Sequence, residues 1–164
     1  MKNKILIAVL FVATLLVTGC GGASNGGFVG TPNTSDTNKQ GVLTCNYDKT
    51  ENDVKFEYVY EITYTGDYVD KLETSQTVIT DNNDVLNRYM KQFASYIDSS
   101  FDGYSVQVLA GGNATTLTTT IDYTKVDLEK LSSVSPTDVA LVKDGKLLVS
   151  DIQTMYESMG ATCK

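Results

Sequence analysis

Histidine is absent from the 164-residue chain, and basic residues are few. Without histidine the chain cannot form a Ser-His-Asp or Cys-His catalytic group or a metal site with histidine ligands. Lys and Arg number 13 against 20 Asp and Glu, which gives a formal net charge of -7. A binder of nucleic acid needs a basic surface to displace counterions from phosphates, so we expect no nucleic-acid partner. The length suits one ordinary domain.

The N-terminal apolar segment, residues 5–17, is too short to cross a membrane stably. It has 13 residues, whereas a transmembrane helix needs about 20. Lys2 and Lys4 precede this segment and Val17-Thr18-Gly19-Cys20 ends it, which is the order of a secretion signal. We therefore expect residues 1–19 to be a removable signal peptide.

A cysteine directly after Thr18-Gly19 distinguishes this signal from an ordinary secretory peptide. Val-Thr-Gly-Cys resembles the lipobox of bacterial lipoproteins. The resemblance implies that Cys20 receives a diacylglycerol, that cleavage falls between Gly19 and Cys20, and that palmitate-type chains hold the mature protein on the extracytoplasmic face of the cell membrane. Two acyl chains anchor a protein stably, whereas one gives marginal binding. The alternative is an ordinary signal peptide followed by a chance cysteine.

Residues 20–41 are expected to be the lipidated cysteine and a flexible linker. Of the 21 residues after Cys20, 14 are Gly, Ser, Thr or Asn, without any period, as is typical of flexible segments. Loss of residues 1–19 removes two lysines and no acid, so 11 basic and 20 acidic side chains remain and the formal charge becomes -9. Anionic headgroups repel such a body, so we expect the domain, residues 42–164, to be held off the bilayer.

Two hairpins are predicted from alternating apolar side chains. Residues 54–64 alternate as in a half-buried strand, and Gly66-Asp67 is placed as a hairpin turn before an extended stretch over residues 68–80. A shorter strand at residues 43–47 is expected to pair with this hairpin. The second hairpin turns at Gly111-Gly112-Asn113, with its strands on either side.

A helix is predicted over residues 84–101, where the apolar period changes from two residues to three or four. An Asn or Asp of residues 81–84 is expected to cap its start, and the helix is expected to end before Gly103. Its apolar stripe should pack on the sheet. That stripe comprises Leu86, Met90, Phe93, Ile97 and Phe101, joined by Val85, Tyr89 and Ala94.

Short helices are expected near the C-terminus, at residues 127–131, from Pro136, and at residues 152–159 behind a capping box of Ser150 and Gln153. Residues 139–149 fit either a helix end followed by a strand, which we favour, or a hairpin. Together the elements predict an α+β fold: an antiparallel sheet of about five strands with one amphipathic helix packed on a face and short C-terminal helices.

With Cys20 carrying lipid, two cysteines remain, Cys45 and Cys163. In an exported protein a disulfide between them is the natural prediction. It would join the first strand to the last residues of the chain. The alternative is a pair of free buried thiols, because sequence alone does not show that the two Cβ atoms are close enough to bond.

The arrangement of lipobox, linker, Tyr-rich hairpin, helix and Thr-rich strand resembles the YehR-like family of small bacterial lipoproteins. The resemblance covers residues 1–20 and 42–164 and is carried by residues 121–127, Ile-Asp-Tyr-Thr-Lys-Val-Asp, and residues 156–164, Tyr-Glu-Ser-Met-Gly-Ala-Thr-Cys-Lys. It implies a lipid-anchored envelope protein and supplies no catalytic residues. The pair of Cys45 and Cys163 lies outside what the resemblance supports.

Three tyrosines of the first hairpin, Tyr58, Tyr60 and Tyr64, are the candidate ligand surface. Aromatic rings with phenolic ends suit sugars, peptides or partner proteins. The alternative is a sheet face covered by the helix, since Phe56 and Ile62 share that side. Rings buried throughout would exclude the surface.

Other chemistry has weaker support. Residues 81–84 are oxygen-rich, but a calcium loop would need Gly at Leu86 and Glu at Gln92. A Ser-Lys pair such as Ser132 and Lys130, or a pair of carboxylates, leaves a small hydrolase as the alternative function. We expect instead a noncatalytic binding or structural module without cofactor or metal, whose partners are the bilayer, through Cys20, and an envelope protein or glycan.

Overall fold

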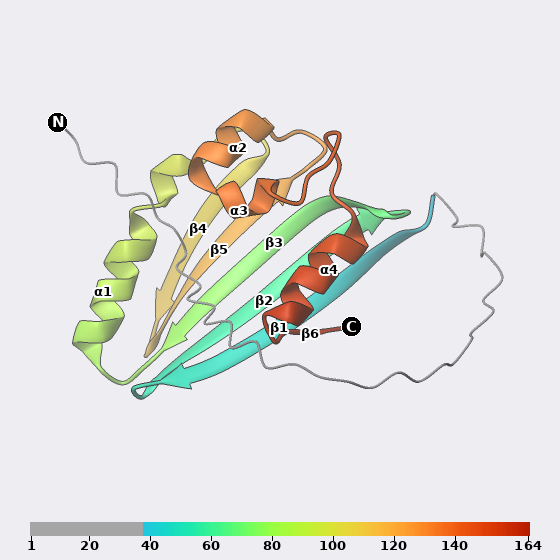
Figure 1. The fold of residues 1–164 in the computed structure, drawn as a ribbon. Helices are drawn as coiled ribbons and strands as arrows, with labels where there is room; N and C mark the ends of the chain where they lie inside the picture. Colours follow the sequence, from blue (N-terminus) through green and yellow to red (C-terminus); the bar gives the residue numbers. More distant parts are fainter. Residues whose placement is uncertain (1–37) are drawn as a thin grey trace, which may run out of the picture. The chain divides into compact units, whose positions relative to one another are not determined.

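Six strands form one antiparallel sheet in the computed structural model, which describes residues 38–164 (Figure 1). Their order across the sheet is β4-β5-β3-β2-β1-β6. The α+β class is confirmed, with one strand more than predicted because the last residues of the chain add a short edge strand. The strands are β1 (Gln40–Glu51), β2 (Val54–Thr65), β3 (Tyr68–Ile79), β4 (Tyr104–Gly111), β5 (Ala114–Asp122) and β6 (Thr162–Cys163).

The predicted signal peptide, Cys20 and residues 21–37 of the predicted linker lie outside the described residues. Gln40 and Gly41 belong to β1, so the sheet begins two residues before the predicted start of the domain. Within residues 38–164, no helix has the length and apolar character needed to cross a membrane.

β1 is much longer than the strand predicted over residues 43–47. It pairs with β2 along its whole length, from Gln40 opposite Thr65 to Glu51 opposite Val54. The turn between them consists of Asn52 and Asp53, both with positive φ, 50° and 61°, a conformation that Asn and Asp tolerate best after Gly. The polar residues that continue β1 hid this extension, because they show no apolar alternation.

One helix packs on the sheet, as predicted, but it is shorter than predicted. α1 (Asn83–Ala94) begins at Asn82, whose side chain accepts hydrogen bonds from the backbone N–H of the second and third residues beyond it. It ends at Ala94, and a 3-10 turn (Ile97–Ser99) follows. Because the helix ends at Ala94, Ile97 does not pack against the sheet and is 45% exposed. Met90, within the helix, is 36% exposed.

The residues of α1 that contact the sheet are Val85, Tyr89 and Phe93, all three of which belong to the predicted stripe or to the residues that join it. Phe93 is its one buried residue. The ring of Tyr89 packs edge-on against Phe56 of β2 with centroids 5.7 Å apart. A spacing of four residues keeps these three side chains on one side of the helix, and Phe56 selects that side.

Three helices follow the second hairpin: α2 (Leu128–Val134), α3 (Pro136–Val139) and α4 (Val149–Ser158). α2 begins one residue after the predicted start, with Asp127 as its N-cap, and Pro136 opens α3, as predicted. The predicted capping box of Ser150 and Gln153 is wrong. α4 starts earlier, after Leu148 and without a side-chain cap, and Gln153 donates a hydrogen bond to Glu157 at 2.8 Å instead.

The segment between α3 and α4 is a tight turn, so the favoured prediction of a helix end and a strand is wrong. Asp144 and Gly145 have positive φ, 51° and 75°. Lys143 and Lys146 close the turn by exchanging backbone hydrogen bonds of 2.8 and 2.9 Å. The hairpin alternative describes this segment better, since Asp-Gly supplies the two left-handed residues that the turn needs.

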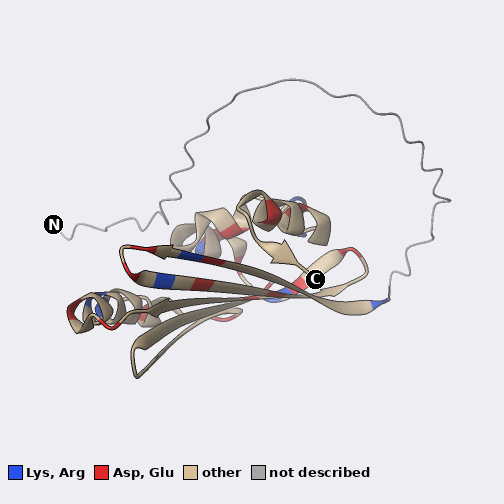
Figure 2. Cartoon of the chain, turned by 90° about the horizontal axis from the view of Figure 1, so that it is seen from below, with Lys and Arg blue, Asp and Glu red and all other residues tan. Residues whose placement is uncertain are grey.

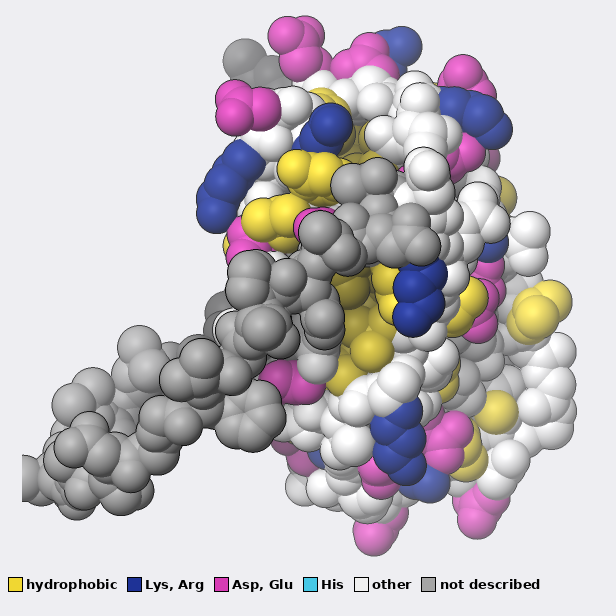
Figure 3. All heavy atoms as spheres, turned by 90° about the vertical axis from the view of Figure 1, so that its right-hand side faces the viewer, with side chains coloured by type: hydrophobic (Ala, Val, Ile, Leu, Met, Phe, Trp, Pro, Cys, Tyr) yellow, Lys and Arg dark blue, Asp and Glu magenta, His cyan; other side chains and the backbone are white. Residues whose placement is uncertain are grey.

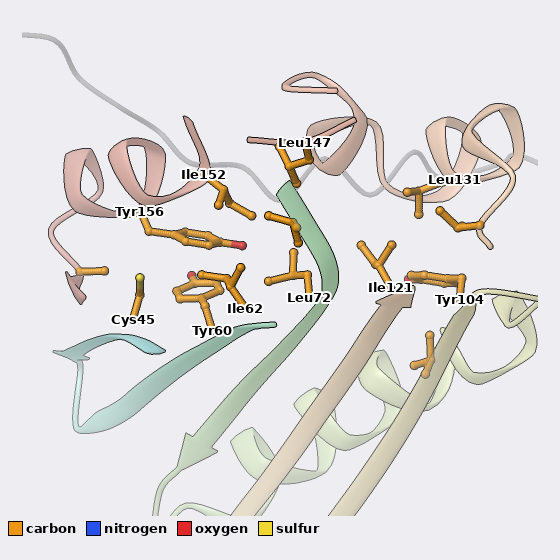
Figure 4. Packing of buried hydrophobic residues seen from close by; sticks show 14 residues of the cluster. Cys45, Tyr60, Ile62, Leu72, Tyr104, Ile121, Leu131, Leu147, Ile152 and Tyr156 are labelled. Atoms are coloured by element: carbon orange, nitrogen blue, oxygen red, sulfur yellow. The ribbon is translucent and has the colours of Figure 1, made fainter. Parts of the chain in front are cut away.

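All the described helices pack on one face of the sheet, which we call the inner face (Figures 1 and 2). The cluster under α2, α3 and α4 is centred on neighbours in three adjacent strands, Ile62, Leu72 and Ile121, each at most 1% exposed (Figure 4). A second cluster, around Phe56 and Val78, lies under α1. The opposite face, the outer face, carries mainly Thr, Ser and charged side chains, such as Ser75 and Thr77 on β3 and Thr116 and Thr118 on β5.

Candidate ligand-binding surface

The predicted disulfide is confirmed. Cys45 on β1 and Cys163 on β6 lie directly opposite each other, with Cα atoms 4.0 Å apart and an S–S distance of 2.00 Å. The flanking residues Thr44 and Lys164 exchange backbone hydrogen bonds of 3.0 and 2.9 Å. Cys45 is fully buried, so the bond closes the core at this edge and fixes the C-terminus to β1.

The three predicted ligand tyrosines have different environments. Tyr60 is buried, 7% exposed, and its ring stacks on Tyr156 of α4 with centroids 3.8 Å apart (Figure 4). Tyr58 and Tyr64 are half-buried, and the Tyr64 ring lies over Gly41 of β1. Tyr60 is therefore part of the core, whereas Tyr58 and Tyr64 keep some surface.

Two tyrosines and a glutamine lie side by side across the inner face, where the two hydrophobic clusters meet. Tyr47 on β1, Tyr58 on β2 and Gln76 on β3 are direct neighbours across the strands. The rings of Tyr47 and Tyr58 are 5.8 Å apart, and the Gln76 amide donates to the Tyr58 hydroxyl at 3.4 Å. All three are half-buried. We call these three residues the tyrosine row.

The surface beside β1 offers apolar contact within charged surroundings. Figure 3 shows hydrophobic side chains exposed in the middle of this side, with basic and acidic side chains around them. Lys49 lies two residues after Tyr47 on β1. Its ammonium group pairs with the Glu51 carboxylate at 3.2 Å and lies 5.4 Å from the centre of the Phe56 ring. Aromatic faces, phenol hydroxyls and an amide can stack against a ligand and exchange hydrogen bonds with it.

The hydroxyls of Tyr58 and Tyr60 remain protonated. Burial raises the pKa of Tyr58, and the nearby Lys49 charge opposes part of that rise. Burial likewise raises the pKa of Tyr60. A neutral phenol both donates and accepts hydrogen bonds, so the row suits uncharged polar groups better than ions.

Asp138 of α3 is a half-buried carboxylate. Burial raises its pKa, and the hydrogen bond that it accepts from Ser135 lowers it. Its backbone carbonyl accepts a hydrogen bond of 3.0 Å from the Tyr123 hydroxyl. The Tyr123 hydrogen bond joins α3 to the residue that follows β5.

The residues considered for a calcium loop and for a Ser-Lys pair make other contacts. Asn82 caps α1, and Asp81 accepts from the Asn113 amide at 2.9 Å. Within residues 38–164 no three potential metal ligands of the His, Cys, Asp or Glu type form a group. The Ser132 hydroxyl donates to the backbone carbonyl of Glu129 at 2.8 Å, and Lys130 pairs with Asp127 at 3.7 Å. Ser132 and Lys130 are thus each engaged elsewhere.

A hollow of about 330 Å³ lies beside Tyr68 and the turn before α4. Lys146 lies 4.6 Å from the centre of the Tyr68 ring, and Lys143 pairs with Asp151 at 3.1 Å. None of the residues that line this hollow belongs to the tyrosine row, so it does not add to the row. Tyr68 itself is 42% exposed.

Sequence reasoning identified Tyr58 but missed Tyr47 and Gln76. Tyr47 stood at the end of a predicted strand of unknown register, and Gln76 stood among polar residues of β3. Their proximity follows from the pairing of three strands. Counting residues outward from the two hairpin turns would have placed Tyr47 and Gln76 opposite Tyr58 on the same face of the sheet.

A known structure shares this fold. The chain is similar to the NMR structure of a protein from Streptococcus pneumoniae TIGR4, with a TM-score of 0.54 and 14% identity over 90% of this chain and 99% of that chain. A more distant likeness is to the NMR structure of the E. coli YehR protein, with a TM-score of 0.49 and 17% identity over 73% of this chain and 88% of that chain. Comparison of the sequence with family models and with curated proteins finds no match. The similarity to the first structure establishes the fold alone.

Proposed function

We propose that the protein is a lipid-anchored, noncatalytic binding module of the bacterial cell envelope and a distant member of the YehR-like lipoproteins. The observation that carries the proposal is how its three cysteines are used. Cys20 stands in a lipobox-like sequence, and the other two, Cys45 and Cys163, form a disulfide. Structural disulfides persist in oxidising compartments outside the cytoplasm, which supports export of the chain.

The anchor and the charge of the chain fit this location. A diacylglycerol on Cys20 would hold the protein on the extracytoplasmic face of the membrane, and residues 21–37 together with the first described residues would separate the sheet from the lipid. The formal charge of -7 for the whole chain opposes direct contact of the body with anionic headgroups. The folded body would then remain available to a partner in the envelope.

The tyrosine row is the proposed contact with that partner, an envelope glycan. Sugars present apolar ring faces edged with hydroxyl groups, and the row offers aromatic faces beside phenol and amide groups. Its three members come from adjacent strands of a sheet, so they are held in fixed relative positions. Binding would not require a catalytic group.

The anchor is tested with Cys20→Ser in intact cells, with Ser24→Ala as the matched change in the predicted linker. We expect the parent protein and Ser24→Ala to sediment with membranes and to incorporate labelled palmitate. Cys20→Ser should lose essentially all of the label and leave the membrane fraction, because no acyl chain remains to hold it. Membrane sedimentation of Cys20→Ser at the parent level would overturn the proposal.

The ligand surface is tested with Tyr47→Ala, and the exposed Tyr68→Ala serves as the control. The detergent-solubilised mature protein is sedimented with purified peptidoglycan sacculi. Loss of a contacting aromatic side chain costs more than about 1 kcal/mol, so Tyr47→Ala should weaken binding about tenfold, while Tyr68→Ala binds as the parent does. Circular dichroism of both variants checks their folding. Equal binding by both variants, or no binding by the parent, contradicts a role of the row in glycan binding.

A further inference from the structure

The two edges of the sheet differ in how their open backbone is protected. At one edge β6 covers the middle of β1 and is fixed there by the disulfide. The part of β1 beyond β6 carries Asp48, Lys49 and Glu51. Short strands and charged side chains are the usual means by which proteins prevent pairing at a sheet edge.

The other edge, β4, has none of these protections. No charged residue occurs from Gly103 to Ile121, 19 residues that include all of β4 and most of β5, and no proline occurs there either. The pairing of β4 with β5 runs without a bulge. Figure 2 shows this hairpin without any basic or acidic residue, on the side of the sheet away from α4. Such an edge is open to pairing with a further strand.

The outward backbone groups of β4 are satisfied at its start and open at its end. Tyr104 exchanges hydrogen bonds of 2.9 and 2.8 Å with Phe101, and the N–H of Val106 donates to the Ser100 hydroxyl at 3.1 Å. In an antiparallel strand the outward groups belong to alternate residues, so Val108 and Ala110 come next. Among residues 38–164 no group makes a hydrogen bond with their outward N–H and C=O.

Leu109, between these two residues, is the most exposed of the large hydrophobic side chains described. It is 67% exposed and lies on the outer face, opposite Thr116 of β5. An exposed leucine on an uncharged, unpaired edge is costly for a protein that must stay soluble, because it invites association.

We infer that β4 is a dimerisation edge, on which the β4 strand of a second copy pairs antiparallel about a two-fold axis at Leu109. In that register Val108 lies opposite Ala110 of the second copy. Each of these residues exchanges both backbone hydrogen bonds with its counterpart, so all the open groups are used. The two copies of Leu109 then form a non-hydrogen-bonded pair, the position at which side chains of paired strands are closest.

A second copy fits this edge better than another partner because of the charge of the chain. With a net charge of -7, two copies repel each other wherever charged surfaces meet. That repulsion is smallest at the uncharged hairpin, where Leu109 of one copy makes an apolar contact with Leu109 of the other. A two-fold contact also closes the assembly, since residues 38–164 of each copy offer one such edge. The inference does not depend on the proposed function.

Leu109→Lys and Leu109→Cys test the dimer, and the same changes at Val42 are the controls. Val42 is 57% exposed and lies on β1, at the opposite side of the sheet. For the detergent-solubilised mature protein we expect sedimentation as a dimer. Leu109→Lys should raise the dimer Kd at least about tenfold, because two lysines would meet across the axis, while Val42→Lys remains a dimer.

The cysteine variants report the register. Leu109→Cys should give a covalent dimer on a non-reducing gel under mild oxidation, since a non-hydrogen-bonded pair brings Cα atoms within disulfide range. Val42→Cys should stay largely monomeric on the same gel. A monomeric parent protein, equal cross-linking of both variants, or growth into fibres rather than a closed dimer would each overturn the inference.

Discussion

Removal of the disulfide between Cys45 and Cys163 is expected to lower the free energy of unfolding by about 4 to 5 kcal/mol. The bond joins residues separated by 118 positions, so in the chain-entropy model it removes a large part of the conformational freedom of the unfolded chain. It also fixes β6, whose two residues pair with β1 alone. Urea titrations of the oxidised protein and of Cys45→Ala/Cys163→Ala measure the difference.

Two comparisons separate the covalent bond from the packing of its side chains. Chemical reduction of the parent protein keeps the sequence and breaks only the bond, and it should produce most of the loss. The double alanine variant additionally loses contacts of the buried Cys45 and should be somewhat less stable still. A loss below about 1 kcal/mol on reduction would mean that β6 and the chain ends contribute little to the stability of the fold.

Ile62→Ala is expected to lower the free energy of unfolding by about 2 to 5 kcal/mol. Ile62 is fully buried at the centre of the inner face, between Leu43 of β1 and Leu72 of β3. Truncation leaves a cavity that neighbours held in two other strands cannot readily fill. Thermal or urea unfolding gives the change directly.

Ile97→Ala is the matched control, because the deleted atoms are the same. Ile97 is 45% exposed, so its truncation should change the free energy of unfolding by less than about 1 kcal/mol. The pair also distinguishes the observed helix from the predicted one, in which Ile97 packed on the sheet. Similar losses at both positions would support the longer predicted helix.

Local sequence signals predicted the hairpins and the cap of α1 because those features depend on few residues. Gly66-Asp67 marked the turn between β2 and β3, and Asn82 was within the four residues expected to cap the helix. The disulfide followed from counting cysteines once Cys20 was assigned to lipid. These inferences need no knowledge of how distant elements pack.

The predictions that failed depended on tertiary contacts. The predicted stripe of α1 included Met90 and Ile97, which are exposed, because the helix ends at Ala94 and Phe56 of β2 selects the side that is packed. Tyr60 was predicted as a ligand contact, but α4 places Tyr156 against its ring. Tyr47 could not be grouped with Tyr58 before the register of β1 was known. For α1 and Tyr60 the deciding residue lies far away in the sequence, and for Tyr47 it lies on the opposite strand of its hairpin.

The chemical state of Cys20 in the mature protein tests the central claim most directly. The measurement is mass spectrometry of the protein purified from membranes, with fragmentation of its N-terminal peptide. The account predicts a chain that begins at Cys20, with the mass of residues 20–164 plus a diacylglycerol on the thiol. A chain that retains residues 1–19, or one that carries an unmodified Cys20 thiol, would contradict it.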